Sequence, residues 1–297
     1  MANYIAKFQT GFRKIKDRLL KNHIVQLVFR TVEGAGNHDI AQRAAGVAYY
    51  AILSIFPMLL GLIAILGFFL PSVNLQDDLL KFVDKNLPGA TDFLIQNIAN
   101  VVRLRGVIGV VSIVILFWGA SGMFSAISLA INRAWDVRSY RPFFIRKASE
   151  LGMVLSMGIL FLLSLGASAG ISILRGVSNL PESDMLIVNV CSRLVAFLLI
   201  LSVFLLLYKL IPNTKTYWRH IWPGALLAAV FFELARVLFI LYIENFANYQ
   251  LIFGSITSII VLLVWIYYSA FIMILGAEFT FQYSRIHSPI NAKSGTK

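Results

Sequence analysis

Charged residues are scarce in this sequence, and their scarcity limits what the chain can be. They make up 13% of 297 residues, whereas a soluble domain carries about 25%. The one cysteine, Cys191, lies inside an apolar run, so no internal disulfide can form. The four histidines are scattered without the spacing of metal ligands, and no glycine-rich phosphate-binding loop is present. The sequence therefore predicts no metal site and no cofactor.

Apolar sequence fills most of the chain instead. Hydrophobic residues make up 59% of it, and the mean hydropathy is +0.79. Six runs reach the roughly 20 residues that a helix needs to cross a hydrocarbon layer. Backbone polar groups in lipid must be satisfied internally, so we predict an all-α polytopic membrane protein with six transmembrane helices. The runs are Ala45–Leu70, Val107–Ile131, Leu151–Leu174, Leu186–Leu210, Trp222–Ile243 and Ser255–Tyr283, and residues 45–283 form one transmembrane domain.

The basic residues sort by loop. Nineteen of the 26 lysines and arginines lie before the first run, between runs two and three, between runs four and five, or after the last run. Because cytoplasmic loops are enriched in these residues, both termini are predicted to be cytoplasmic. This distribution explains the net charge of +12 without a nucleic-acid partner.

Three segments outside the runs have their own character. In residues 1–44, apolar side chains at helical spacing alternate with basic ones, which predicts an amphipathic helix on the anionic inner leaflet. A helix packed on the bundle's own loops is the alternative. The outer loop, residues 71–106, is predicted to form two short amphipathic helices that either cap the bundle or rest at the lipid interface. Residues 284–297 are predicted to be a cytoplasmic tail.

Ionisable groups inside the runs are the main candidates for function. Glu233 and Arg236 are three residues apart, so they share a helix face near the membrane midplane, and Arg193 has a similar depth in the preceding run. An uncompensated charge at that depth costs at least about 2.5–3.5 kcal/mol. We therefore predict a cluster of these three residues with one net positive charge. It either fixes the helix register or accepts the phosphate or carboxylate of a substrate.

Other residues are candidates for pairing, bending or packing. Glu278 lies near the cytoplasmic end of the last run, where it is expected to pair with Arg285 or a basic loop, or to accept a proton. Pro57 is predicted to kink the first helix, as a hinge or as a static bend, where Ser54 can help satisfy the freed carbonyls. The Gly166-x-x-x-Gly170 spacing permits close helix contact.

Several separated motifs resemble the YihY/BrkB family of bacterial inner-membrane proteins. Arg43-Ala-Ala-Gly-Val-Ala-Tyr-Tyr50, continuing through Leu53-Ser54-Ile55-Phe56-Pro57, resembles its opening signature. Leu210-Ile-Pro-Asn213 with Trp222-Pro-Gly224 resembles its fourth connection. Phe232-Glu233-Leu234 with Arg236, and Gly276-Ala277-Glu278, resemble its last two spans. The resemblance covers Arg43 to Tyr283 and marks Tyr50, Pro57, Asn213 and Glu278 as structural or gating residues.

The resemblance implies the bacterial plasma membrane, and its members have been called transporters, linked with lipid-precursor export or labelled ribonuclease. Hydrolysis needs clustered carboxylates or histidines, which this sequence lacks, so we predict that the chain is not an enzyme. We predict transport of an anionic amphiphile, a lipid or lipid-linked precursor, with membrane lipids as partners. The alternatives are a gradient-driven transporter of small solutes or ions, with Glu233 as a proton or cation site, and a non-transporting envelope scaffold. The sequence gives no oligomeric state.

Overall fold

The computed structural model describes residues 23–69, 107–137, 142–177, 182–246 and 255–287. Within these ranges the regular structure is α-helical and no strand occurs, in agreement with the all-α prediction. The helices are α2 (His23–Asn37), α3 (Ile40–Phe69), α6 (Val107–Ala134), α7 (Phe143–Val177), α8 (Glu182–Leu210), α9 (Trp218–Phe246) and α11 (Ser255–His287).

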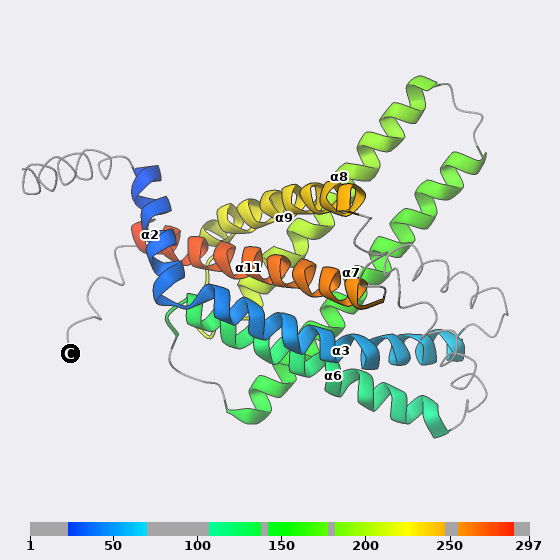
Figure 1. Ribbon diagram of the computed structural model, residues 1–297, viewed down its shortest axis with the longest axis horizontal. Helices are drawn as coiled ribbons and strands as arrows, with labels where there is room; N and C mark the ends of the chain where they lie inside the picture. The colour runs from blue at the N-terminus through cyan, green and yellow to red at the C-terminus, as the bar shows by residue number, and fades with distance from the viewer. Residues whose placement is uncertain (1–22, 70–106, 138–141, 178–181, 247–254, 288–297) are drawn as a thin grey trace, which may run out of the picture.

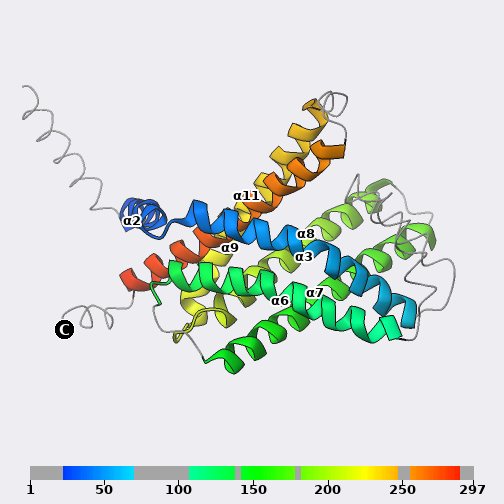
Figure 2. The same ribbon diagram turned by 60° about the horizontal axis from the view of Figure 1, so that its bottom comes forward.

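The six long helices form a closed ring in chain order. Each contacts the next, and α11 returns to α3 while also touching α6 across the ring. Neighbours run antiparallel, and Figures 1 and 2 show three pairs, α3–α6, α7–α8 and α9–α11, which meet at one end of the molecule and separate toward the other. We call these the convergent end and the divergent end. Helix α2 runs across the convergent end, roughly perpendicular to the bundle, and packs mainly on α11.

Small residues bring the helices together at the convergent end. A Cβ added to Gly224 of α9 would lie 2.8 Å from the carbonyl oxygen of Gly276 on α11, and one added to Gly276 would lie 2.7 Å from the Cβ of Ala228. The hydroxyl of Tyr208 on α8 donates to the carbonyl of Met273 at 2.7 Å. In contrast, among the described residues nothing lies within 4 Å of a Cβ added to Gly166, so close packing was predicted at one glycine and occurs at others.

Several helices extend beyond the apolar runs, and the longest extension, that of α7, is at the convergent end. Helix α3 begins at Ile40 rather than Ala45, α7 at Phe143 rather than Leu151, and α11 continues to His287. Hydropathy reports only the part of a helix that is apolar enough to cross lipid, whereas these additional turns carry polar residues that pack at the end of the bundle. Helix α3 continues through Pro57, and the Ser54 hydroxyl donates to the Tyr50 carbonyl at 2.7 Å.

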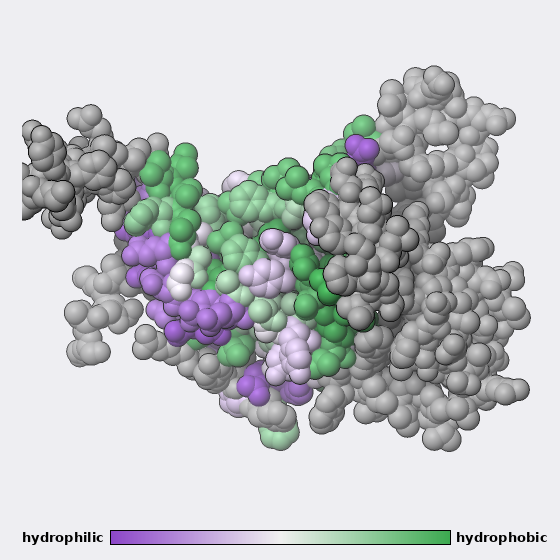
Figure 3. Space-filling model, viewed as in Figure 1, coloured by the Kyte–Doolittle hydropathy of each residue, from purple (hydrophilic) through white to green (hydrophobic). Residues whose placement is uncertain are grey.

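The arrangement fits a membrane protein. Among the described residues, three helical segments are long and apolar enough to cross a membrane, Val190–Leu210, Trp218–Ile243 and Ile259–His287. On the face shown in Figure 3, the end of α11 and the lower end of α2 are hydrophilic, whereas the upper part of α2 and much of the middle of the bundle are apolar. The described parts of the four segments predicted to be cytoplasmic all lie at the convergent end. The count of six spans and the cytoplasmic side of that end stay predictions.

Three predicted features lie wholly or partly outside the described residues. These are residues 1–22 of the basic amphipathic segment, the outer loop with its short helices, and the tail from residue 288 onward. The described remainder of the first segment is α2 and the start of α3.

Candidate functional site

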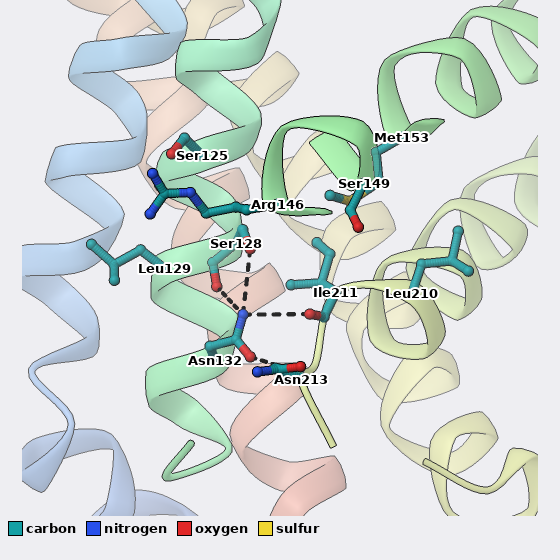
Figure 4. Close-up of a pocket in the computed structure, with 10 residues that line it drawn as sticks. All are labelled: Ser125, Ser128, Leu129, Asn132, Arg146, Ser149, Met153, Leu210, Ile211 and Asn213. Carbon is teal, nitrogen blue, oxygen red and sulfur yellow. Dashed lines mark hydrogen bonds between the residues drawn. The ribbon is translucent and has the colours of Figure 1, made fainter. Parts of the chain in front are cut away.

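A polar pocket lies at the convergent end between α6, α7 and the turn that follows α8. Its volume is about 90 Å³. Figure 4 shows the Arg146 side chain reaching from α7 toward α6, where it lies between Ser125 and Leu129. The lining residues are Ser125, Ser128, Leu129 and Asn132 of α6, Arg146, Ser149 and Met153 of α7, and Leu210, Ile211 and Asn213.

Asn132 fixes the floor of the pocket by joining two parts of the chain. Its Nδ2 donates to the carbonyl of Ser128 at 2.8 Å and to the carbonyl of Ile211 at 3.4 Å, and its Oδ1 accepts the backbone N–H of Asn213 at 2.7 Å (Figure 4). The end of α8 has no further helical turn to satisfy these backbone groups. An amide, with a donor and an acceptor on one side chain, can satisfy both. Asn213, predicted to be a structural or gating residue, therefore lies in the pocket wall.

The charge at the pocket is positive. Glu150, which is buried, lies 3.0 Å from Lys147 Nζ, and Lys147 also donates to the Ser121 hydroxyl at 3.0 Å. The Arg146 Nε lies 3.9 Å from the same carboxylate. Two cations, Lys147 and Arg146, thus lie beside one acid and close to the serine hydroxyls. A guanidinium among hydroxyl groups is a suitable environment for phosphate or carboxylate oxygens.

Apolar side chains form part of the pocket wall. Leu129 and Leu210 line the pocket and are themselves exposed. The pocket is smaller than the roughly 300–1,000 Å³ of sites that enclose a drug-sized ligand. It can hold a charged group while an attached apolar part stays outside, against these leucines.

The structure brings together two of the three residues predicted to form a buried cluster. Arg236 and Glu233 form an ion pair on α9. Arg193 lies exposed on α8, and among the described residues it forms no ion pair with either of them. Glu233 and Arg236 are only partly buried, at the start of the divergent half of α9. Whether the three residues bind substrate stays a prediction.

The remaining predicted residues fall in two places. Glu278 is fully buried at the convergent end, where its carboxylate contacts His38 rather than Arg285, whose guanidinium lies over the Phe281 ring. Tyr50 is exposed on α3, where its ring meets that of Tyr49 edge-on. Tyr50 is not among the residues that line the pocket. Pro57 lies seven residues further along the same helix, about two turns, and its side chain lies outside the described residues.

Sequence reasoning did not find the pocket. The hydropathy pattern placed Arg146 in the loop between the second and third apolar runs. In the structure it lies in α7, which begins eight residues before the third run. The available signal was the row of small polar residues Ser125, Ser128 and Asn132, which lie three and four positions apart on one face of α6.

Comparison with known proteins identifies the chain's relatives. Residues 31–296 match the family described as Virulence factor BrkB. The chain belongs to the BrkB family. The resemblance drawn from the motifs is thereby confirmed.

Its BrkB relatives include bacterial membrane proteins. A UPF0761 membrane protein of Vibrio vulnificus is 35% identical over 82% of this chain and 78% of its own length. A UPF0761 membrane protein of Vibrio cholerae is 34% identical over 85% of each chain. The ribonuclease-like protein YfkH of Bacillus subtilis is 31% identical over 81% of this chain and 89% of its own. No solved structure matches the chain.

Proposed function

We propose that this BrkB protein transports an anionic amphiphile, a lipid or lipid-linked precursor, across the bacterial plasma membrane. The observation that carries the proposal is the position of the pocket. It combines a guanidinium with three serine hydroxyls, and it opens beside apolar helix surface. A molecule with a charged head and apolar tails matches both parts, whereas a small inorganic anion would use only the first.

The divergent end offers a place for the tails. Large apolar side chains are exposed there on α8, α9 and α11, among them Leu194, Leu238 and Ile260. In a bilayer such surfaces contact acyl chains, so a lipid can lie between or beside the helix pairs with its tails in the hydrocarbon layer.

The Glu233–Arg236 pair supplies a second polar position along the same route. Glu233 lies eleven residues beyond Trp222, about 16 Å further along α9. We propose that a headgroup passes from the pocket to this pair, with Arg193 of α8 as a further cation on the route. The proposal assigns the chain no catalytic step. Because the Bacillus subtilis relative is named ribonuclease-like, hydrolysis of RNA is tested directly.

The experiment is lipid translocation in vesicles. Purified protein is reconstituted with fluorescent phosphatidylglycerol or phosphatidylcholine, and the movement of each lipid between leaflets is measured with a membrane-impermeant quencher, with and without a proton gradient. We expect faster movement of phosphatidylglycerol. Arg146→Gln should lower its rate roughly tenfold to hundredfold, because a charge-assisted hydrogen bond contributes about 1.5–3 kcal/mol.

Arg219→Gln is the matched control. Arg219 is exposed at the start of α9 and lies outside the pocket. Its replacement by glutamine removes the same charge as Arg146→Gln. Ser128→Ala is a second pocket variant. It tests the role of the pocket in lipid movement if Arg146→Gln lowers the yield of folded protein. Equal movement of both lipids at the rate of empty vesicles would contradict the proposal. Flux of a small anion or protons without lipid movement would favour a solute transporter, and hydrolysis of added RNA would favour an enzyme.

A further inference from the structure

Glu278 is a buried acid at the convergent end, and its carboxylate contacts a residue from a distant segment of the chain. Its side chain has no exposed surface, and its Oε2 lies 2.7 Å from Nδ1 of His38. Its Oε1 accepts a hydrogen bond from Nε2 of Gln282 at 2.7 Å. Both oxygens are therefore engaged, one by the amide of Gln282 and the other by the imidazole ring of His38.

This contact holds α2 to the bundle. A Cβ added to Gly34 of α2 would lie 2.0 Å from the Glu278 Oε1, so the α2 backbone rests directly on the carboxylate. Leu27 and Thr31 are buried on the same face of α2. The turn to α3 is tight, with Asp39 at a φ of 51°, and Arg43 Nε donates to the His38 carbonyl at 2.9 Å. His38 is therefore fixed over the carboxylate by its own backbone.

The other charged groups around Glu278 do not neutralise it directly. Among the described residues, His38 alone forms an ion pair with this carboxylate. Asp136, at the end of α6, is a second acid nearby. From α3, Arg43 contacts the His38 carbonyl, and from α9, His220 lies against Tyr283. Within α11, Gln282 is neutral and Arg285 lies over Phe281.

We propose that Glu278 and His38 form a proton-binding site that keeps α2 docked while the pair holds one proton. With that proton the pair is neutral overall, as an ion pair or as a neutral acid beside a neutral ring. Loss of the proton leaves a buried carboxylate beside a neutral imidazole, and an uncompensated buried charge is strongly destabilising. His38 is partly exposed, which gives the proton a path to water. The inference does not depend on transport.

Helix α2 has a surface on which to rest when it leaves α11. Ile24, Val28 and Val32 are exposed at four-residue intervals, which places them in one stripe beside the buried face. An apolar stripe on a helix that runs across the end of a bundle suits the lipid interface. Undocking would therefore move α2 along the membrane surface rather than into water.

The test measures, as the pH changes, how accessible the buried face of α2 is to a thiol reagent. In a Cys191→Ser background, Thr31→Cys places a thiol on the buried face, and Val32→Cys places one on the exposed face of the same helix. Thr31 is 6% exposed and Val32 is 65% exposed. Maleimide labelling rates are measured in nanodiscs from mildly acidic to alkaline pH. The ratio of the two rates removes the intrinsic pH dependence of thiol chemistry.

We expect the ratio of position 31 to position 32 to rise about tenfold as the pair loses its proton on the alkaline side. Glu278→Gln removes the proton-binding acid but keeps an acceptor and a similar shape, so its ratio should stay low and flat. His38→Gln leaves the carboxylate without its partner, so its ratio should already be high near neutral pH. Gly34→Ala should raise the ratio at every pH, because its Cβ cannot fit against Oε1.

Two results would overturn the proposal. One is a ratio that does not change with pH when Glu278 and His38 are both present. The other is a rise of equal size in the Glu278→Gln protein, which would assign the proton to another group. A low ratio in Gly34→Ala would also count against it, since Thr31 would then stay covered without the docking that the carboxylate provides.

Discussion

The two halves of α8 have opposite surroundings. Leu207, toward the convergent end, is 5% exposed. Leu194, thirteen residues earlier in the divergent half, is 56% exposed, and residues 193–196 are exposed on every side of the helix. The same change runs along α9, from buried Ala225 and Ala228 to exposed Leu238, and along α11 in the reverse order. Apolar composition therefore specifies that a helix enters lipid, and other residues specify where it meets another helix.

The physical reason is that lipid tails are as apolar as leucine. The hydrophobic effect therefore does not favour a helix–helix contact over a helix–lipid contact. Association depends on close packing and on hydrogen bonds. The convergent end provides both, through Gly224, Gly276 and the hydroxyl of Tyr208. The divergent end presents bulky side chains to the bilayer. Substitutions should therefore be costly at one end and mild at the other.

The largest effect is expected from Gly276→Val. An added Cβ would already lie 2.3 Å from the Tyr208 hydroxyl and 2.7 Å from the Cβ of Ala228, and valine adds two further methyl groups. Overpacking of this kind typically costs about 1–3 kcal/mol, and more when the neighbour is close to backbone. We expect little folded protein by fluorescence-detected size-exclusion chromatography. Gly158→Val on α7, where nothing lies within 4 Å, is the control and should fold normally.

A pair of leucines on α8 tests the comparison directly. Leu207→Ala should lower the free energy of unfolding by about 3 kcal/mol, because it opens a cavity among packed helices. Leu194→Ala should change it by less than about 0.5 kcal/mol, since lipid fills the space that the side chain leaves. Reversible unfolding in mixed micelles measures both values. Similar losses at the two positions would mean that the divergent half is also packed against protein in the membrane.

A smaller effect is expected from Tyr208→Phe. The substitution keeps the ring but removes the hydrogen bond to the Met273 carbonyl. One buried hydrogen bond contributes about 1 kcal/mol, so the thermal midpoint should fall by a few degrees. Tyr217→Phe, at an exposed tyrosine in the turn before α9, should leave the midpoint unchanged. If both variants behave alike, the Tyr208 hydroxyl does not hold α8 to α11.

The sequence alone predicted the helices and the family, because both depend on residues that lie close together in the chain. Each long helix contains its predicted apolar run, except that Leu70 at the end of the first run lies outside the described residues. The motifs from Arg43 to Glu278 identified the relatives. Helix ends were less accurate. The first turns of α7 are polar because they pack at the convergent end, so hydropathy placed that helix eight residues too late.

The contacts of the candidate sites were not predictable in the same way, because each joins segments far apart in the sequence. Glu278 was expected to pair with Arg285 or a basic loop, or to accept a proton. Arg285 is seven residues, about 10 Å, further along the helix, and the partner His38 comes from the other end of the chain. Asn132 meets Asn213 across 81 positions. A single sequence gives the chemistry of such residues but not the neighbours that use it.

The smallest effect concerns the charges in the divergent half, where the structure separates Arg193 from the Glu233–Arg236 pair. In double-mutant cycles with glutamine substitutions, Glu233 and Arg236 should show a coupling free energy of about 1 kcal/mol or more, since the two form an ion pair in an apolar environment. Glu233 and Arg193 should show less than about 0.5 kcal/mol, because residues without a shared contact behave additively. Unfolding in mixed micelles gives both couplings. A coupling of Arg193 as strong as that of Arg236 would restore the predicted three-residue cluster, and it would mean that the helix pairs lie closer together in the bilayer. Ion pairs would then join the helices in the divergent half, whereas close packing joins them in the convergent half.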